Sequence, residues 1–239
     1  MQIKKRPQQE TLHDEPHPKQ DFQVERIAFF SDAVFAIAIT LLIIEFHPPH
    51  MTKETTYGEV WHELKDMRFK LLALLLSFVL IIGYWMRHHT LFKYVHNYNK
   101  EIVLANMALL FPIIFFPFTT SFLYESLNGS LAAVVIPYRL FMFNNILAGA
   151  FTYYFFWLIV RKHKGHAYPM KKEDKSEFNI NVLISTISFA LVLILSFYSI
   201  EKSAWGIVPF ALYRFYLKFI KKTKNTPVPN VKQTGGPGH

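Results

Sequence analysis

One carboxylate stands well inside an apolar segment of the chain. Asp32 is followed by residues 33–44, in which Thr40 is the only polar residue, and Glu45 marks the far edge of this segment. A carboxylate surrounded by apolar side chains is costly unless it is hydrogen-bonded. Asp32 therefore indicates one of two things, a proton or ion site or a structural clamp.

Aliphatic residues of the same segment recur at helical spacing. An α-helix turns about 100° per residue, so Ile37, Leu41 and Ile44 lie within roughly 40° of a common line. We call these three residues the aliphatic stripe. Thr40 lies at its edge, whereas Asp32 points roughly 140° away from Ile37. This separation favours a clamp for the carboxylate, and it leaves the aliphatic stripe to face a pore, the lipid or another helix.

Partners for Asp32 are expected on neighbouring helices. Arg26 lies six residues earlier, about 120° around the helix, so the two side chains are poorly placed to pair along one face. Trp85 and His88 are three residues apart near the end of a later apolar run, and Asn106 lies in the run after that. We expect Trp85, His88 and Asn106 to bond to Asp32, and Arg26 to bond to a neighbouring helix.

The composition is that of an integral membrane protein. The chain of 239 residues is 51% hydrophobic and 17% aromatic, with a mean hydropathy of +0.17. It has no cysteine, which excludes disulfides, thiol nucleophiles and thiolate metal sites. The formal net charge of +9 comes from basic residues at the ends of apolar runs, so membrane topology explains it better than nucleic-acid binding.

Six apolar runs predict an all-α protein with six transmembrane helices. We expect a cytoplasmic tail over 1–24, a membrane domain over 25–222, and a C-terminal tail over 223–239 whose Pro/Gly-rich end is typical of residues added for expression. Within the membrane domain the predicted runs are 24–46, 69–86, 102–123, 138–160, 180–200 and 204–220.

The distribution of basic residues predicts the orientation. Lysines and arginines gather in the N-terminal tail, in the second and fourth connections and after the last run, while the other connections carry few. Under the positive-inside rule both termini of this multi-pass protein are then cytoplasmic, which is consistent with a location in the cell membrane.

Short motifs in the first three runs resemble the signature of the transmembrane protein 175 family of potassium channels. The first run carries R-x-x-x-F-S-D as Arg26, Phe30, Ser31 and Asp32. The second ends in W-x-x-H and the third carries N…P-F-[ST]-[ST], here Trp85, His88, Asn106, Pro117, Phe118, Thr119 and Thr120. The resemblance covers about half of the chain, and the last three runs add only hydropathy.

The resemblance implies an architecture and roles for these residues. In this family the first helix lines a central pore, and the matching constriction here is Ile37, Leu41 and Ile44. Thr40 matches the threonine implicated in potassium preference, and the signature residues tie the pore helix to its surroundings. A single repeat per chain implies the prokaryotic branch and a homotetramer in the lipid bilayer.

The expected function is a cation channel with a modest preference for potassium and no enzymatic activity. No cofactor or structural metal is expected, only a permeant potassium ion passing near Thr40. The sequence carries no T-V-G-Y-G filter, voltage-sensor repeat, nucleotide loop or zinc motif. The alternative is a proton-coupled secondary transporter that uses Asp32, and an intramembrane enzyme lacks a convincing nucleophile or metal set.

Overall fold

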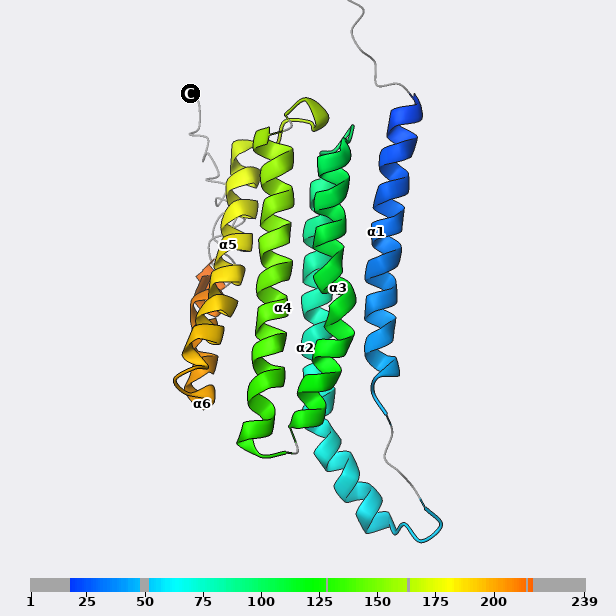
Figure 1. Cartoon of the computed structure of the whole chain (residues 1–239), viewed down its shortest axis with the longest axis vertical. Coiled ribbons are helices and arrows are strands. Elements are labelled where there is room, and N and C mark those ends of the chain that lie inside the picture. Colours follow the sequence, from blue (N-terminus) through cyan, green and yellow to red (C-terminus); the bar gives the residue numbers. More distant parts are fainter. Residues whose placement is uncertain (1–17, 48–51, 128, 163, 214, 217–239) are drawn as a thin grey trace, which may run out of the picture.

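Long helices running side by side make up the protein (Figure 1). The computed structural model describes residues 18–47, 52–127, 129–162, 164–213 and 215–216. Its helices are α1 (Pro18–Ile44), α2 (Tyr57–Phe92), α3 (Lys100–Ser126), α4 (Leu131–Trp157), α5 (Lys172–Leu195) and the short α6 (Ile200–Ser203). A π-helical turn spans Leu158–Lys162, and 3₁₀ turns span Lys164–His166 and Ala204–Ile207. These described residues form no strand, which confirms the all-α prediction.

Five of the described helices are long and apolar enough to cross a membrane. They correspond to the first five predicted runs, so the chain is a multi-pass membrane protein. The described part of the sixth predicted run, 204–220, is helical after its opening 3₁₀ turn, and residues 217–220 lie outside the described residues. The same is true of 1–17 in the predicted N-terminal tail and of the whole predicted tail 223–239.

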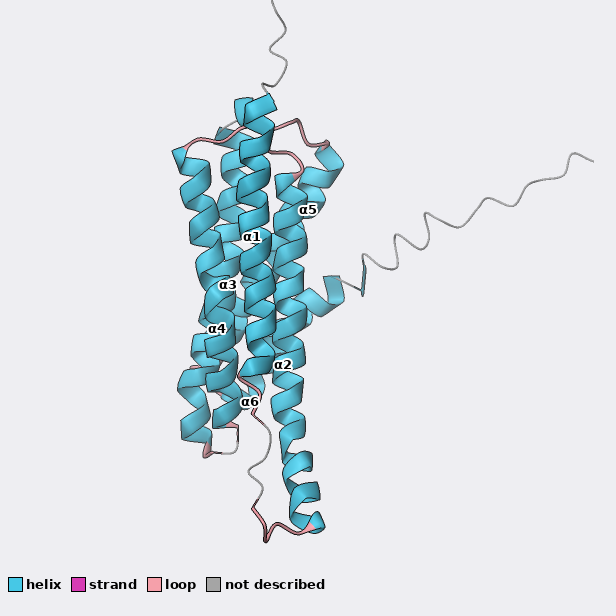
Figure 2. Ribbon diagram, turned by 90° about the vertical axis from the view of Figure 1, so that its right-hand side faces the viewer, coloured by secondary structure: helices cyan, strands magenta, loops and turns pink. Residues whose placement is uncertain are grey.

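Polar caps set helix ends that hydropathy does not show. Thr56 and Glu59 form a capping box at the start of α2, in which the Thr56 N–H donates to Glu59 Oε2 at 2.7 Å. Asn99 caps α3 by accepting the Ile102 N–H at 2.9 Å. Because α2 begins at its cap and not at its apolar run, it projects past the other helices (Figures 1 and 2).

Two predicted features of the later helices differ from the structure. Pro137 suits a first helical turn, but α4 already begins at Leu131, so Pro137 is buried inside the helix. The fifth apolar run does not stay helical to residue 200, because α5 ends at Leu195. Ser199 then adopts an extended backbone and caps α6 by accepting the Lys202 N–H at 3.4 Å.

α3 occupies the middle of the bundle. It packs against α1, α2 and α4, while α1 lies at one edge and α5 at the other (Figure 1). Phe116 of α3 is fully buried and contacts the rings of Tyr84 and Phe141, with centroids 5.9 and 6.0 Å apart. α4 and α5 approach closely at Gly149, where a Cβ would overlap Thr186. The result is a layered bundle in which α1 has neighbours on one side only.

Candidate functional site

The two faces of α1 meet different surroundings. Phe35, Ala38 and Leu42 are at most 2% exposed and pack into the bundle. The aliphatic stripe faces the other way: Ile37, Leu41 and Ile44 are 58%, 36% and 64% exposed in the single chain. A contiguous apolar face of this kind needs lipid or protein against it. The structure thus leaves the stripe available to another copy of the chain.

Thr40 and Phe30 lie beside the stripe, and their side chains differ in polarity. The side chain of Thr40 is exposed, and its hydroxyl donates to the Ile37 carbonyl at 2.9 Å. Because the hydroxyl hydrogen is used within the helix, the oxygen lone pairs remain to accept a cation or a water molecule. Phe30 is 53% exposed, and seven residues before Ile37 it lies about 20° from the line of the stripe. We expected Phe30 to help fix α1, but it points to the same side as the stripe.

A buried chain of hydrogen bonds joins three helices near the start of the stripe. Ser31 of α1, His88 of α2 and Asn106 of α3 are each at most 1% exposed. Asn106 Nδ2 donates to Ser31 Oγ at 2.9 Å, and Asn106 Oδ1 lies 2.8 Å from His88 Nε2. Because a carbonyl oxygen accepts only, His88 must carry its proton on Nε2. We call these three residues the buried network.

Asp32 is bonded separately from the buried network. Trp85 Nε1 donates to Asp32 Oδ1 at 2.9 Å, which joins the signature carboxylate to α2. His88 and Asn106, expected to bond to Asp32, bond to the neighbouring Ser31 through the buried network. Arg26 is exposed, and in the described part of the chain it makes no bond to another helix. Asp32 therefore lies in a clamp-like contact.

The opposite end of α1 is held by a residue that sequence reasoning missed. The hydroxyl of Tyr124 in α3 donates to the Glu45 carbonyl just after α1, and its ring lies 6.5 Å from that of Phe46. The only sequence signal is a tyrosine shortly after the P-F-T-T stretch. In that stretch Thr120 Oγ1 lies 2.7 Å from Ser77 Oγ, joining α3 to α2. α1 is thus held by contacts on either side of the stripe, before it at Ser31 and Asp32 and after it at Glu45, while the stripe itself stays uncovered.

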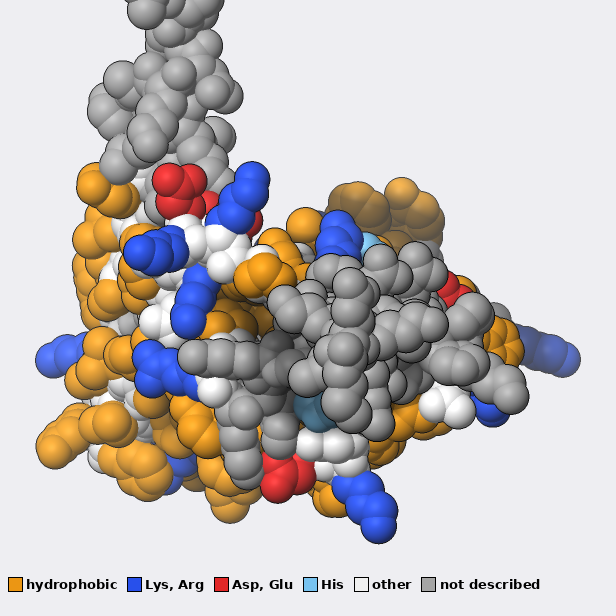
Figure 3. Space-filling model, turned by 90° about the horizontal axis from the view of Figure 1, so that it is seen from above, with side chains coloured by type: hydrophobic (Ala, Val, Ile, Leu, Met, Phe, Trp, Pro, Cys, Tyr) orange, Lys and Arg blue, Asp and Glu red, His pale blue; other side chains and the backbone are white. Residues whose placement is uncertain are grey.

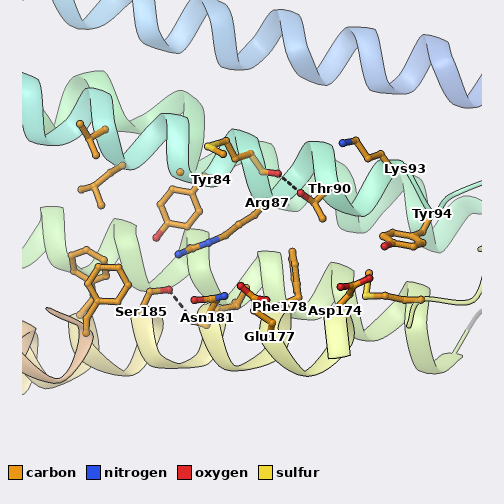
Figure 4. A pocket seen from close by; sticks show the side chains of 18 residues that line it. Tyr84, Arg87, Thr90, Lys93, Tyr94, Asp174, Glu177, Phe178, Asn181 and Ser185 are labelled. Carbon is orange, nitrogen blue, oxygen red and sulfur yellow. Dashed lines mark hydrogen bonds between the residues drawn. The ribbon is translucent and has the colours of Figure 1, made fainter. Parts of the chain in front are cut away.

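A cleft of about 750 Å³ lies between α2 and α5, away from α1 (Figure 4). Arg87 of α2 extends toward α5, and Asp174 and Glu177 line the cleft from α5. Lys93, just after α2, is also among the lining residues, but its side chain points away from α5. No residue of α1 lines it, so it is separate from the stripe. Among the described side chains no group of three or more His, Asp or Glu residues could hold a metal ion.

Comparison with known proteins finds that this chain is similar to members of one family. Residues 26–117 match the family model described as "Endosomal/lysosomal potassium channel TMEM175". A potassium channel of Streptomyces collinus is 28% identical over 211 residues, which is 86% of this chain and 98% of the relative. A potassium channel of Chamaesiphon minutus is 40% identical over 102 residues, which is 43% of this chain and 50% of the relative.

A solved structure agrees with the fold. The crystal structure of a lysosomal potassium-selective channel TMEM175 homolog from Chamaesiphon minutus aligns with a TM-score of 0.65 and 25% identity. The alignment covers 82% of this chain and 98% of that one. The family match in the first three helices therefore extends, at the level of fold, over most of the bundle.

Proposed function

The chain belongs to the TMEM175 family of potassium channels, and from this premise we propose that several copies form a cation channel lined by α1. One observation carries the proposal: the aliphatic stripe is uncovered, although α1 is bonded to its own bundle both before and after the stripe. One helix from each chain cannot enclose a pore alone, so the copies are arranged by rotation about the axis of the pore. We propose four copies, giving a mass four times the 28.1 kDa of the chain.

The stripe supports a hydrophobic neck. With a rise of about 1.5 Å per residue, the rings of Ile37, Leu41 and Ile44 span about 10 Å along a pore. A cation inside such rings loses part of its hydration shell and gains no ligand in exchange. The neck then blocks ions when narrow, and it conducts when α1 tilts or turns enough to admit water.

The orientation proposed for the channel rests on its charged end. Seen from the end where α1 begins, lysine and arginine side chains occupy several parts of the surface (Figure 3). The described basic residues of this end include Lys93, Lys100, Arg161, Lys172 and Lys175. By the positive-inside rule we propose that this end faces the cytoplasm of a cell whose plasma membrane holds the channel.

Potassium flux tests the proposed function directly. We expect liposomes containing the purified protein to release potassium down its gradient and to give single-channel currents in a planar bilayer. The alternative transporter would instead give slow, saturable, proton-coupled exchange that Asp32→Asn abolishes. The bond from Trp85 to Asp32 favours a fixed carboxylate over a proton carrier. Flux that depends on a proton gradient and shows no unitary currents would contradict the channel.

Thr40→Val is expected to reduce the preference for potassium over sodium. Valine keeps the shape of threonine but removes the hydroxyl oxygen that we propose contacts a partly hydrated ion. Loss of one such contact is worth roughly 1 kcal/mol, or about a fivefold fall in the permeability ratio. Reversal potentials under bi-ionic conditions measure this ratio. Thr40→Ser restores the oxygen and is the matched control; an unchanged ratio in the valine variant would remove Thr40 from the selectivity mechanism.

A further inference from the structure

A second, smaller cleft lies between α4 and α5, on the side of the bundle away from α1 (Figure 1). Its volume is about 210 Å³. The residues that line it come from the end of α4, the π-helical turn and the start of α5: Tyr153, Phe156, Trp157, Arg161, Lys172, Lys175, Ser176 and Asn179. We call it the α4–α5 cleft.

Among the described residues that line the α4–α5 cleft, all the charged side chains are positive. Arg161, Lys172 and Lys175 supply three cations, and no carboxylate lies among its lining residues. The cleft between α2 and α5 differs, because it combines cations with Asp174 and Glu177. The uniform charge of the α4–α5 cleft is therefore complementary to an anion.

The helical repeat of α5 explains how its charges are sorted. Residues 172, 175, 176 and 179 follow the i, i+3, i+4, i+7 spacing of one helix face and line the α4–α5 cleft. Residues 174, 177, 178 and 181 follow the same spacing on another face and line the other cleft. α5 thus presents its cations to one neighbour and its acids to the other. Glu173, also in the first turn, is exposed and lines neither cleft.

Aromatic side chains form the inner wall of the α4–α5 cleft. Phe156 is 5% exposed and its ring stacks on Phe178 with centroids 4.9 Å apart, while Trp157 stacks on Tyr154 at 6.2 Å. Trp157 and Tyr153 are half-buried, and Arg161 follows Trp157 by four residues. Tryptophan and tyrosine beside lysine and arginine are typical of the level at which lipid headgroups meet acyl chains.

We propose that the α4–α5 cleft binds an anionic phospholipid from the leaflet at the basic end of the bundle. The phosphate lies among Arg161, Lys172 and Lys175, and Ser176 and Asn179 are within the same lining to donate further hydrogen bonds. The volume accommodates a headgroup, so the acyl chains lie outside it along the aromatic wall. Basic pockets between transmembrane helices recognise anionic headgroups in this way. The site is separate from the stripe and does not depend on conduction.

Lipid retention in detergent tests the site. We expect the full-length protein to retain phosphatidylglycerol in preference to phosphatidylcholine with the same acyl chains, as counted by native mass spectrometry. Each cation near an anionic lipid contributes about a fivefold gain in binding, so R161Q/K172Q/K175Q should weaken phosphatidylglycerol binding on the order of 100-fold. R161K/K172R/K175R keeps the charges and should retain the lipid.

A variant with the same change in charge at the other end of the bundle is the control. Lys53, Lys65 and Arg68 are exposed, and K53Q/K65Q/R68Q also removes two lysines and one arginine. We expect this variant to bind phosphatidylglycerol like the wild type. Three results would each overturn the proposal. The two variants could lose phosphatidylglycerol equally, the wild type could retain phosphatidylcholine as well as phosphatidylglycerol, or millimolar inorganic phosphate could displace the lipid completely. A change of oligomer mass in R161Q/K172Q/K175Q with lipid retention intact would also overturn it, because it would indicate a second copy in the cleft.

Discussion

Replacing Ile37 by asparagine is expected to raise the potassium conductance of the reconstituted protein. Asparagine has as many side-chain heavy atoms as isoleucine, but its amide can bind water and a passing cation. A ring of amides at the neck replaces part of the hydration that hydrocarbon denies to the ion. A barrier lowered by about 2 kcal/mol corresponds to roughly a thirtyfold increase in conductance. Leu41→Asn should act in the same direction.

Ile43 provides a matched control on the same helix. It is 59% exposed, close to the 58% of Ile37, yet it lies about 120° around α1 from the stripe. Ile43→Asn introduces the same amide on another face of α1, about 9 Å farther along the helix and within one residue of the depth of Ile44. We expect conductance to remain near the wild-type value. Single-channel recording in planar bilayers measures both variants. If Ile37→Asn conducts like the wild type, the stripe does not border the ion path; if both variants conduct more, the effect is a general leak.

Hydropathy predicted the five long helices of the described residues and their order, because a bilayer span requires a long apolar run. It could not predict where several helices begin and end. The capping box at Thr56 starts α2 well before its apolar run, and the extended backbone at Ser199 separates α6 from α5. Such ends depend on hydrogen bonds of individual polar residues, whose effect on a hydropathy average is small. The observed helix boundaries therefore differ from the predicted ones where a capping residue, and not the apolar run, sets the end of the helix.

The spacing of residues predicted faces of α1 but not all of its partners. Asp32 does contact Trp85, whereas His88 and Asn106 bond to Ser31. Ser31 and Asp32 are adjacent and point about 100° apart, so a small rotation of α1 decides which of them meets α3. The rotation of α1 about its own axis cannot be worked out from a single sequence. The pore and selectivity roles of the stripe and of Thr40 stay predictions, because they depend on how copies meet.

The buried network supplies the second large effect, a loss of stability in Asn106→Leu. Leucine has the same branching at Cγ as asparagine, but it removes two hydrogen bonds from the interior. His88 Nε2 and Ser31 Oγ both lose their Asn106 partner. His88 Nδ1 is already buried without a partner in the described structure, so the ring would have no hydrogen bond left. At about 1–3 kcal/mol for each of these two groups, we expect a loss of roughly 2–6 kcal/mol.

Asn144 is the control for a buried asparagine outside the network. It is 1% exposed, and its Nδ2 donates to the Pro112 carbonyl at 3.0 Å. Asn144→Leu removes this one bond and leaves α1 untouched. We expect a smaller fall in melting temperature in detergent and unchanged potassium conductance. Asn106→Leu should also alter conductance, because it removes a bond that holds α1 just before the stripe. Equal losses of stability in the two variants, with equal conductance, would show that the network has no special role in holding α1.

A triple apolar substitution separates lost hydrogen bonding from lost packing. His88 already lies among aromatic rings, with centroids 4.5 Å from Phe92 and 5.4 Å from Phe35, so phenylalanine suits its position. In S31A/H88F/N106L no polar group of the network remains to be left without a partner. Replacing all partners of a buried bond by apolar groups costs much less than removing one of them. We therefore expect the triple variant to melt at a higher temperature than Asn106→Leu alone; a lower melting temperature would mean that shape, not hydrogen bonding, makes the network stable.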